Sequence, residues 1–359
     1  MKRHFEILDG LRGTAALVVL FFHLLDGLLP YASNPLRHAY LAVDFFFLLS
    51  GFVIGYAYDD RWPGLSLGDF LRARLIRLHP LVLLSVGLGA LCYWLDPFVG
   101  ESQHVGGARL ALLVGFGALL LPTPSSTIPG GWLTHPLNSP GWSLLQEYLA
   151  NVAYALVGWR LGRRVLGAVV VVAALALVAA ALKHGSLDGG YAWHSLWMAP
   201  VRVAFPFAAG LLLHRLGAHI RVPGAYVGLS VLLVLAFAAP AFEPAAYYQV
   251  FCVLVIFPLI VAMGAGSATA GRLSGLCRFS GRLSYPLYLI HFPFTSIFAH
   301  WRTATHPSPG QTWVVAAALL LFVLALSWVA LRFYDEPVRA WLSARARRRQ
   351  ALRLQLQSA

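Results

Sequence analysis

The stretch LRGTAALVVLFFHLLDGLL, residues 11–29, is an apolar run that contains one arginine, one histidine and one aspartate. A helix needs about 20 mostly apolar residues to cross the roughly 30 Å hydrocarbon layer of a membrane. The run has that length, and its ionisable residues are widely spaced. The sequence therefore predicts that the chain begins with a helix that crosses a lipid bilayer.

The composition of the whole chain supports this interpretation. Hydrophobic residues make up 59% and charged residues 11% of the 359 residues, against about 45–50% and about 25% in soluble domains. A water-soluble globule of this size would have too much surface for so few charges. Disorder is also excluded, because disordered chains are poor in apolar residues and rich in charge. Lipid is therefore the solvent for most of this protein.

Ten more apolar runs follow the first one. They are centred on residues 40–58, 75–95, 106–121, 142–159, 165–182, 197–214, 222–240, 247–265, 283–300 and 313–334. The run at 106–121 is the weakest, because glycines dilute it and Pro122 ends it. We therefore predict an all-α polytopic integral membrane protein with about ten transmembrane helices, in which 106–121 enters the membrane without spanning it.

Charge gives the expected orientation of the chain. Lys and Arg number 27 against 14 Asp and Glu, for a net charge of +13. In a membrane protein such an excess collects in cytoplasmic loops, so we expect no nucleic-acid partner. If 106–121 does not span, most of the basic residues lie on the side of both chain ends. The sequence thus predicts two cytoplasmic termini, a transmembrane domain over 5–340 and a basic tail over 341–359 that rests on anionic lipid.

The cysteines give no sign of a metal site. Cys92, Cys252 and Cys277 form no CxxC motif, and no histidine stands at ligand spacing. This pattern is typical neither of a zinc site nor of a disulfide framework. We predict no bound metal and no bound cofactor.

Ionisable residues within lipid are costly and usually functional, and the first helix carries two of them on one face. Arg12 and His23 are eleven positions apart, which is about 1100° of helical rotation and within about 20° of three full turns. Their axial separation is about 16 Å, so Arg12 is expected at the inner interface and His23 about halfway across. A cation at the mouth and a deep imidazole suit an anionic ligand from the cytoplasm. The alternative is a histidine that only hydrogen-bonds a neighbouring helix.

A second group of basic residues opens the third span. In FLRARLIRLHP, residues 70–80, Arg74 and Arg77 are i,i+3 neighbours on one helix face. Arginine binds phosphate in a bidentate manner. The alternative is a cytoplasmic cluster that only sets the topology, although Arg77 lies one turn inside the apolar run.

Polar residues in three other segments are further candidates. Asp44, in VDFFFLLSGF (43–52), could pair with Arg37, orient a histidine or cap its helix. Glu147, in WSLLQE (142–147), lies too deep in its helix to be a simple dipole partner. Tyr285 and His291 stand in the apolar segment SYPLYLIHFP, residues 284–293, where tyrosines are also typical of the membrane interface.

Taken together and in this order, these segments resemble the membrane-bound acyltransferase-3 family of bacterial O-acyltransferases. The resemblance covers about residues 5–340. Many members carry a further hydrolase-like domain after the membrane part, and we expect this chain to be the stand-alone form. The matching segments are LDGLRGTAALVVLFFH (8–23), VDFFFLLSGF, FLRARLIRLHP, WSLLQE and SYPLYLIHFP. The family's Arg-x10-His corresponds to Arg12 and His23, its Arg-x-x-Arg to Arg74 and Arg77, and its WSL-x-x-Glu to Trp142, Ser143 and Glu147.

The resemblance implies transfer of an acyl group, usually acetyl, from cytoplasmic acyl-CoA to a hydroxyl of a cell-envelope or exported glycan. It implies that His23 is the general base or is acylated first, with Glu147 or Asp44 orienting it. The donor would bind Arg12, Arg74 and Arg77. Residues expected at the acceptor are Trp142, Ser143, Tyr285 and His291.

The resemblance also implies that the protein lies in the bacterial cytoplasmic (inner) membrane, with acyl-CoA and a glycan or glycolipid acceptor as partners beside the lipid bilayer. The segments 122–141 and 183–196, rich in aromatic and polar residues, are where we expect the acceptor to be selected. A carrier or flippase for an envelope lipid or glycan is the alternative function.

Overall fold

The computed structural model describes residues 4–30, 33–99, 105–128, 131–240 and 244–358. In this part of the chain the regular elements are helices, and the one isolated β-bridge joins Leu133 and Ala192. The helices are α1 (Glu6–Leu28), α2 (Ala42–Tyr58), α3 (Leu67–Leu95), α4 (Gly107–Ala118), α5 (Gly141–Leu156), α6 (Arg163–His184), α7 (Met198–Leu216), α8 (Ala225–Phe237), α9 (Ala245–Phe251), α10 (Phe257–Gly266), α11 (Gly271–Thr305), α12 (Pro309–Val329) and α13 (Glu336–Ser358).

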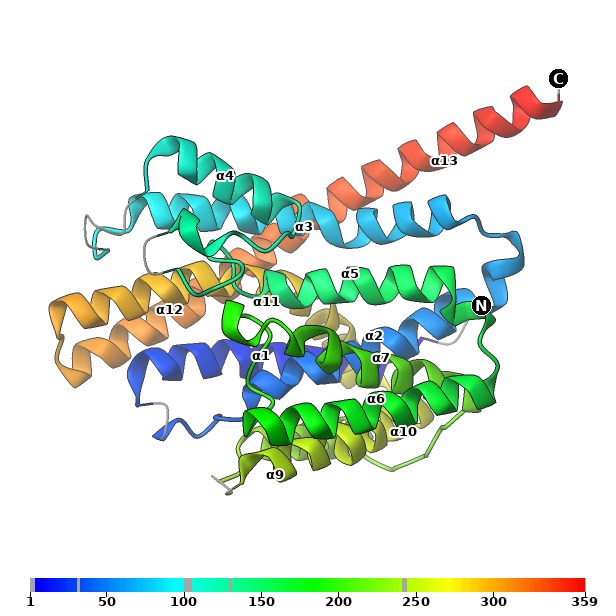
Figure 1. Ribbon diagram of the computed structural model, residues 1–359, viewed down its shortest axis with the longest axis horizontal. Coiled ribbons are helices and arrows are strands. Elements are labelled where there is room, and N and C mark those ends of the chain that lie inside the picture. Colours follow the sequence, from blue (N-terminus) through cyan, green and yellow to red (C-terminus); the bar gives the residue numbers. More distant parts are fainter. Residues whose placement is uncertain (1–3, 31–32, 100–104, 129–130, 241–243, 359) are drawn as a thin grey trace.

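Two of these helix junctions are single turns of π-helix. Cys252–Ile256 joins α9 to α10, and Ala330–Asp335 joins α12 to α13. The chain therefore continues through each junction without a loop, so that α9 and α10 form one apolar unit. Most helices run side by side along the long axis of the bundle (Figure 1).

The prediction of an all-α membrane protein is confirmed. Among the described residues, six helices are long and apolar enough to cross a membrane. They are Glu6–Leu28, Ala39–Trp62, Leu67–Leu95, Arg163–His184, Ala245–Gly266 and Pro309–Arg348. The larger total of about ten spans, and the cytoplasmic location of the termini, stay predictions. In Figure 1 the N-terminal end of α1 and α13 lie toward the same end of the bundle.

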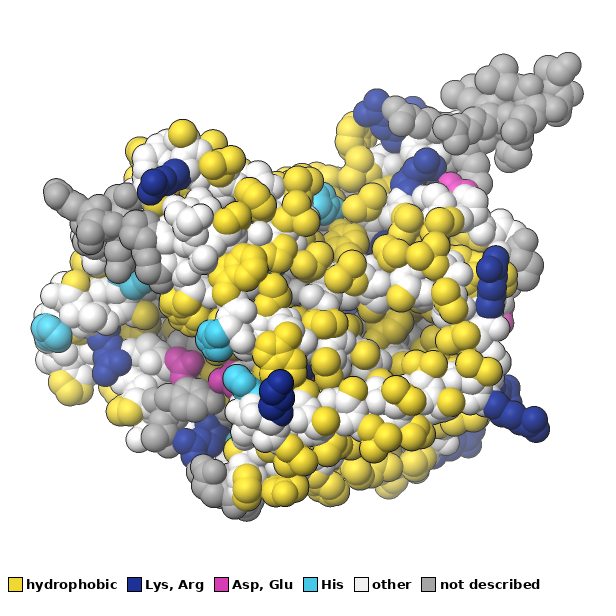
Figure 2. Space-filling model, in the orientation of Figure 1, with side chains coloured by type: hydrophobic (Ala, Val, Ile, Leu, Met, Phe, Trp, Pro, Cys, Tyr) yellow, Lys and Arg dark blue, Asp and Glu magenta, His cyan; other side chains and the backbone are white. Residues whose placement is uncertain are grey.

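The outer surface agrees with a lipid environment. The face shown in Figure 2 is covered mostly by hydrophobic side chains, with few charged groups among them. On α6 and α12, Val172, Leu175, Val314 and Leu321 are each more than half exposed. Contiguous exposed apolar surface of this kind is rare on soluble monomers and marks contact with a membrane or a partner.

The helix α4 occupies the weakest apolar run. It has 12 residues and is therefore about 18 Å long, well short of the hydrocarbon layer. Gly117 packs close to Val86 of α3, and the chain turns at Leu120, whose φ is 54°. The carbonyl oxygen of Leu120 accepts a hydrogen bond from Nε2 of His135 at 3.1 Å. This short helix and the turn after it agree with the prediction of a segment that does not span.

Glycines allow the central helices to touch backbone to backbone. A Cβ atom added at Gly210 of α7 would lie 2.0 Å from the carbonyl oxygen of Leu48, and one at Gly51 of α2 would lie 2.0 Å from that of Phe207. Small residues at such interfaces are typical of helix packing in membranes, because close approach gives van der Waals contact that lipid cannot replace. The α2–α7 contact therefore depends on these two glycines.

The variant Gly210→Ala is expected to separate α2 from α7 and to lower stability by about 1–3 kcal/mol, the usual cost of overpacking. The matched control is Gly167→Ala in α6, where an added Cβ meets nothing within 4 Å. Thermal unfolding in detergent measures both. Equal melting temperatures for the two variants would contradict the close packing of α2 and α7.

Candidate active site

A cavity of about 160 Å³ lies between α1, α2, α3, α5 and α11. We call it the inner cavity, because it lies nearer the end of the bundle at which α1 begins. Its polar lining consists of Arg12, Ser50, Arg74, Arg77, Ser143, Glu147, Ser284, Tyr285 and Tyr288. The structure thus brings the three arginines expected at the donor to one place, although they come from two helices.

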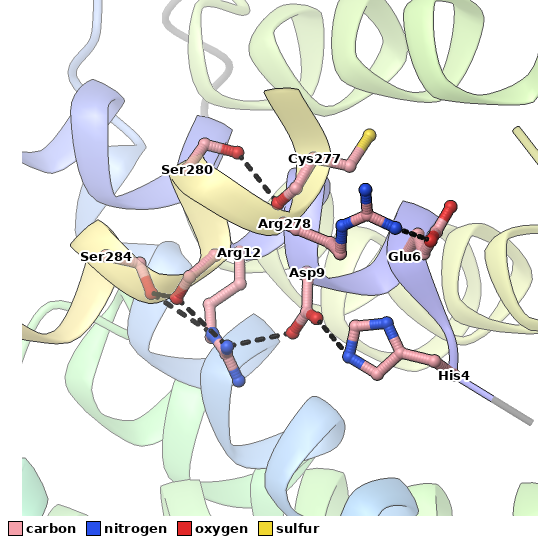
Figure 3. Close-up of polar contacts among 9 residues, drawn as sticks. His4, Glu6, Asp9, Arg12, Cys277, Arg278, Ser280 and Ser284 are labelled. Atoms are coloured by element: carbon pink, nitrogen blue, oxygen red, sulfur yellow. Dashed lines mark hydrogen bonds and ion pairs between the residues drawn. The ribbon is translucent and has the colours of Figure 1, made fainter. Parts of the chain in front are cut away.

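The guanidinium of Arg12 is fixed by hydrogen bonds on both sides (Figure 3). It donates to Asp9 at 2.9 Å, to Ser284 at 3.1 Å and to the carbonyl oxygen of Gly281 at 3.0 Å. The other carboxylate oxygen of Asp9 lies 3.0 Å from Nε2 of His4. Arg12 is therefore held against α11 at the edge of the inner cavity, with its charge partly balanced.

The other two arginines differ in their partners. Arg74 donates to Glu147 at 3.0 Å, and the same carboxylate oxygen accepts a hydrogen bond from Ser50 at 2.9 Å. Nε of Arg74 is buried without a partner. Arg77 has neither a hydrogen bond nor an ion pair with any residue that the structure describes. A half-buried cation without a counterion is costly, so the inner cavity is suited to an anion.

A second cavity, of about 590 Å³, lies beyond the inner one. We call it the outer cavity. His23 and Asp26 of α1 line it, and α2, α5, α7 and α11 complete its walls. The other polar or aromatic lining residues are Phe22, Tyr40, Trp132, Ser139, Trp142, Asp188, Tyr191, Arg202, Tyr288, Phe292, Thr295 and Ser296.

Two loops that are distant in sequence form the roof of the outer cavity. The backbone N–H of Thr134 donates to the carbonyl of Tyr191 at 2.9 Å, and that of Trp193 donates to the carbonyl of Trp132 at 3.0 Å. Both loops lie within the segments 122–141 and 183–196, which the sequence analysis expects to select the acceptor. The structure brings these segments together over one cavity.

His23 lies beside a second histidine. Its ring stacks on that of His291, with centroids 5.2 Å apart and planes at 28°, and meets Phe292 edge-on. Nδ1 of His291 donates to the carbonyl oxygen of Leu287 at 3.0 Å, which leaves its Nε2 buried without a partner. His23 itself makes no hydrogen bond to any described residue. The structure therefore gives no support to the alternative in which His23 only ties two helices together.

Asp44 has a partner that the sequence did not suggest. It forms an ion pair with Arg202 of α7, and the two side chains are 0% and 1% exposed. Arg202 also donates to the carbonyls of Gly189, at 2.8 Å, and Tyr40, at 3.1 Å. Its guanidinium lies 5.2 Å from the centre of the Trp142 ring. Asp44 lines neither cavity, so the contact it makes is structural, and its catalytic role stays a prediction.

Sequence reasoning did not single out Arg202. The available signal was an arginine inside an apolar span, which requires a buried partner. The acceptor residues expected from the sequence are also divided by the structure. Trp142 lines the outer cavity, whereas Ser143 and Tyr285 line the inner one, as Glu147 does. His291 lines neither cavity, and its contact with the site is the stacking of its ring on that of His23.

The fold and this site define a helical membrane protein in which arginines and a histidine face two adjoining internal cavities. A family model described as "Acyltransferase domain" matches residues 5–332. The chain therefore belongs to this family, the acyltransferase-3 family, and is a membrane acyltransferase, as the resemblance implied. No solved structure matches the chain.

Two curated proteins are similar to this chain. "Protein 2 in picA locus" of Rhizobium radiobacter is 36% identical over 186 residues, which cover 49% of this chain and 94% of that protein. "Acyltransferase MdmB" of Streptomyces mycarofaciens is 26% identical over 359 residues, which cover 90% of this chain and 87% of that protein. The chain is thus similar to an acyltransferase over most of its length.

The buried pair of Arg202 and Asp44 gives a prediction about stability. Removing one partner leaves an unpaired charge in the bundle, which costs about 3–5 kcal/mol. Asp44→Asn and Arg202→Met are each expected to lower the melting temperature strongly. The control is Asp69→Asn, because Asp69 and Arg72 form an exposed pair that is worth about 0–1 kcal/mol. A melting temperature of the Asp44 variant equal to that of the control would show that the buried pair is not needed.

The roof of the outer cavity is expected to weaken in acid because of His135. Burial lowers the pKa of this loop histidine from 6.5 to about 4. In acid, His135 of the unfolded chain binds a proton that the folded loop excludes. The free energy of unfolding of the loop is therefore highest above pH 6.5 and decreases as the pH falls toward 4. The loss is at most about 3 kcal/mol. Limited proteolysis of the loop between pH 7 and pH 4.5 measures it, and His135→Gln should abolish the pH dependence. Cleavage that does not change with pH would contradict the prediction.

Proposed function

We propose that this membrane acyltransferase moves an acyl group, in the first place acetyl, from a cytoplasmic acyl-CoA to a hydroxyl of a cell-envelope or exported glycan. The observation that carries the proposal is the pair of adjoining cavities. One presents arginines, and the other presents His23 among aromatic and acidic side chains. These are the complementary sites that a phosphate-bearing donor and a polyhydroxy acceptor require.

The inner cavity is proposed to receive the donor. Coenzyme A carries phosphates, for which the planar guanidinium of arginine is suited. Arg77 has no counterion among the residues that the structure describes, and the free Nε of Arg74 offers a further donor. The volume of about 160 Å³ is below the roughly 300 Å³ of pockets that enclose whole drug-sized ligands. The cavity therefore fits the thioester end of the donor, with phosphates held by the arginines at its mouth.

The outer cavity is proposed to receive the acceptor. Its volume of about 590 Å³ is in the range of pockets that enclose a small ligand. Trp132, Trp142 and Tyr191 offer ring faces and edges for the apolar faces of a sugar. The carboxylates of Asp26 and Asp188 accept hydrogen bonds from hydroxyl groups. This combination supports a glycan or a similar polyol as the acceptor.

His23 is proposed to link the two half-sites. As a general base it takes the proton of the acceptor hydroxyl while the oxygen attacks the thioester carbonyl carbon. The carbon–sulfur bond then breaks, and the leaving thiolate takes the proton back from the imidazole. In the alternative route the imidazole accepts the acyl group first and passes it to the hydroxyl. Both routes need a ring nitrogen that is not held by another protein group, and His23 meets this condition within the part of the chain that the structure describes.

A carrier or flippase for an envelope lipid or glycan is a second candidate, because the two cavities lie one after the other along the bundle. A carrier moves its substrate without an acyl donor and yields no labelled product. Incubating the purified protein with radiolabelled acetyl-CoA, and then with glycan extracts of the cell envelope, separates the two functions. Label that stays on the protein before the acceptor is added supports the acyl-histidine route.

Three variants test the proposed roles. His23→Ala is expected to lower transfer of the radiolabelled acetyl group by about 10²–10⁴-fold, the usual contribution of a general base. Arg77→Ala is expected to raise KM for acetyl-CoA by about tenfold, since a charge-assisted contact is worth about 1.5–3 kcal/mol. Arg72→Ala is the control on the same helix, because Arg72 is exposed and pairs with Asp69. Full transfer by the His23 variant at matched expression would exclude both chemical routes.

A further inference from the structure

The inner and outer cavities have two lining residues in common among those that the structure describes, Val43 and Tyr288. Val43 has no polar side-chain atom. Among the described residues, Tyr288 is therefore the one with a polar side-chain atom that borders both cavities. On the proposed function, the thioester carbonyl must come to this boundary, because the donor enters from the inner cavity and His23 faces the outer one.

The hydroxyl of Tyr288 is already part of a hydrogen-bonded pair. It lies 2.8 Å from Oγ of Ser143, and Oγ of Ser143 donates to the carbonyl oxygen of Pro140 at 2.9 Å. A serine hydroxyl has one hydrogen to donate. While Ser143 donates to Pro140, Tyr288 is the donor in the pair with Ser143. The resting structure thus contains a buried hydroxyl that carries a proton to donate.

The position of this hydroxyl is well fixed. The side chains of Tyr288 and Ser143 are nearly buried, at 8% and 4% exposure. The Tyr288 ring packs edge-on against Phe46, with centroids 5.6 Å apart, and Asn138 holds the neighbouring backbone by donating to the carbonyl of Leu289 at 2.9 Å. Donors that are held in place before the reaction stabilise a developing charge most effectively, because no reorganisation is needed.

We propose that Tyr288 is a further catalytic residue, whose hydroxyl donates a hydrogen bond to the acyl carbonyl oxygen and stabilises the oxyanion of the tetrahedral intermediate. Ser143 is the positioning residue. It accepts the hydrogen bond of Tyr288 in the resting state, and it donates to the Tyr288 oxygen when the O–H bond of Tyr288 rotates toward the acyl group while the ring stays in place. Neither hydroxyl is left without a partner, which would be costly at this depth.

The step balances in either chemical route. The attacking atom, a hydroxyl oxygen or a His23 nitrogen, forms a bond to the carbonyl carbon, and the carbonyl π electrons move to the oxygen. That oxygen accepts the hydrogen bond of Tyr288, which keeps its own proton throughout. The electrons then return to re-form the carbonyl, the carbon–sulfur bond breaks and the thiolate leaves. In the general-base route the thiolate takes the proton that His23 removed from the acceptor. In the acyl-histidine route the thiolate takes the N–H proton of the acylated imidazole.

The variant Tyr288→Phe tests this role, because it removes one oxygen and keeps the ring that packs on Phe46. Loss of an oxyanion donor lowers kcat by about 10²–10³-fold, so we expect this loss with KM for acetyl-CoA unchanged within about twofold. Ser143→Ala is expected to lower kcat by less, because the Tyr288 hydroxyl remains. The control is Tyr248→Phe, a tyrosine that donates to the carbonyl of Ala236 and borders neither cavity.

The assay follows release of the coenzyme A thiol from acetyl-CoA, with glycan extracts of the cell envelope as acceptor. Binding of radiolabelled acetyl-CoA and thermal unfolding are measured on the same proteins, because a merely structural tyrosine would alter them. Replacing Tyr288 with a fluorinated tyrosine gives an independent readout. Its more acidic phenol should restore kcat and move the alkaline loss of activity to lower pH.

Three results would overturn the proposal. The first is a kcat of Tyr288→Phe within threefold of that of the unmodified protein, and the second is a loss of donor binding or of stability in Tyr288→Phe that accounts for its lost activity. The third is an unchanged pH profile of activity when a fluorinated tyrosine replaces Tyr288. These outcomes differ from a failure of the proposed function. In that case the unmodified protein itself would release no thiol and label no acceptor.

Discussion

The desolvation of charge inside a lipid-embedded bundle is the constraint on which this structure depends. A charged group here must find an opposite charge, a set of hydrogen bonds or a ligand. Arg202 satisfies the rule with Asp44 and two backbone carbonyls. Arg12 satisfies it with Asp9 and with α11. Arg77 does not satisfy it within the described chain, and it borders a cavity. The charge of Arg77, which is unpaired within the described chain, is thus what suits the adjacent cavity to binding an anion.

Contacts within one helix could be predicted from the sequence, because helical geometry alone determines them. The spacing of Arg12 and His23 predicts one face and different depths, and in the structure both side chains face internal cavities at different positions along α1. The i,i+3 pair of Arg74 and Arg77 likewise lines one cavity. The short apolar run at 106–121 forms the 12-residue helix α4, because its glycines and Pro122 leave too few helix-forming residues for a longer one.

Contacts between helices could not be predicted in this way. Arg202 lies 158 positions after Asp44, and Glu147 lies 97 positions after Ser50. A periodic pattern gives the face of each helix but neither its neighbour nor its axial offset from that neighbour. For the same reason the residues expected at the acceptor form one group by sequence but are separated in space, with Trp142 at the outer cavity, Ser143 and Tyr285 at the inner one, and His291 at neither. Trp142 and Ser143 are adjacent in sequence and point to different cavities, since neighbouring residues on a helix differ by about 100° in direction.

The boundary between the cavities also bears on why transfer would be favoured over hydrolysis. A thioester at the boundary would be bordered by Val43, Phe46 and Phe47 on the donor side, and these side chains offer water no hydrogen bond. His23, the proposed base, lies on the other side, where the acceptor fills the space that water would otherwise occupy. Excluding water strengthens each electrostatic interaction at the carbonyl. In the general-base route, a donor held in one cavity and a base that faces the other would therefore react only when the acceptor is bound between them.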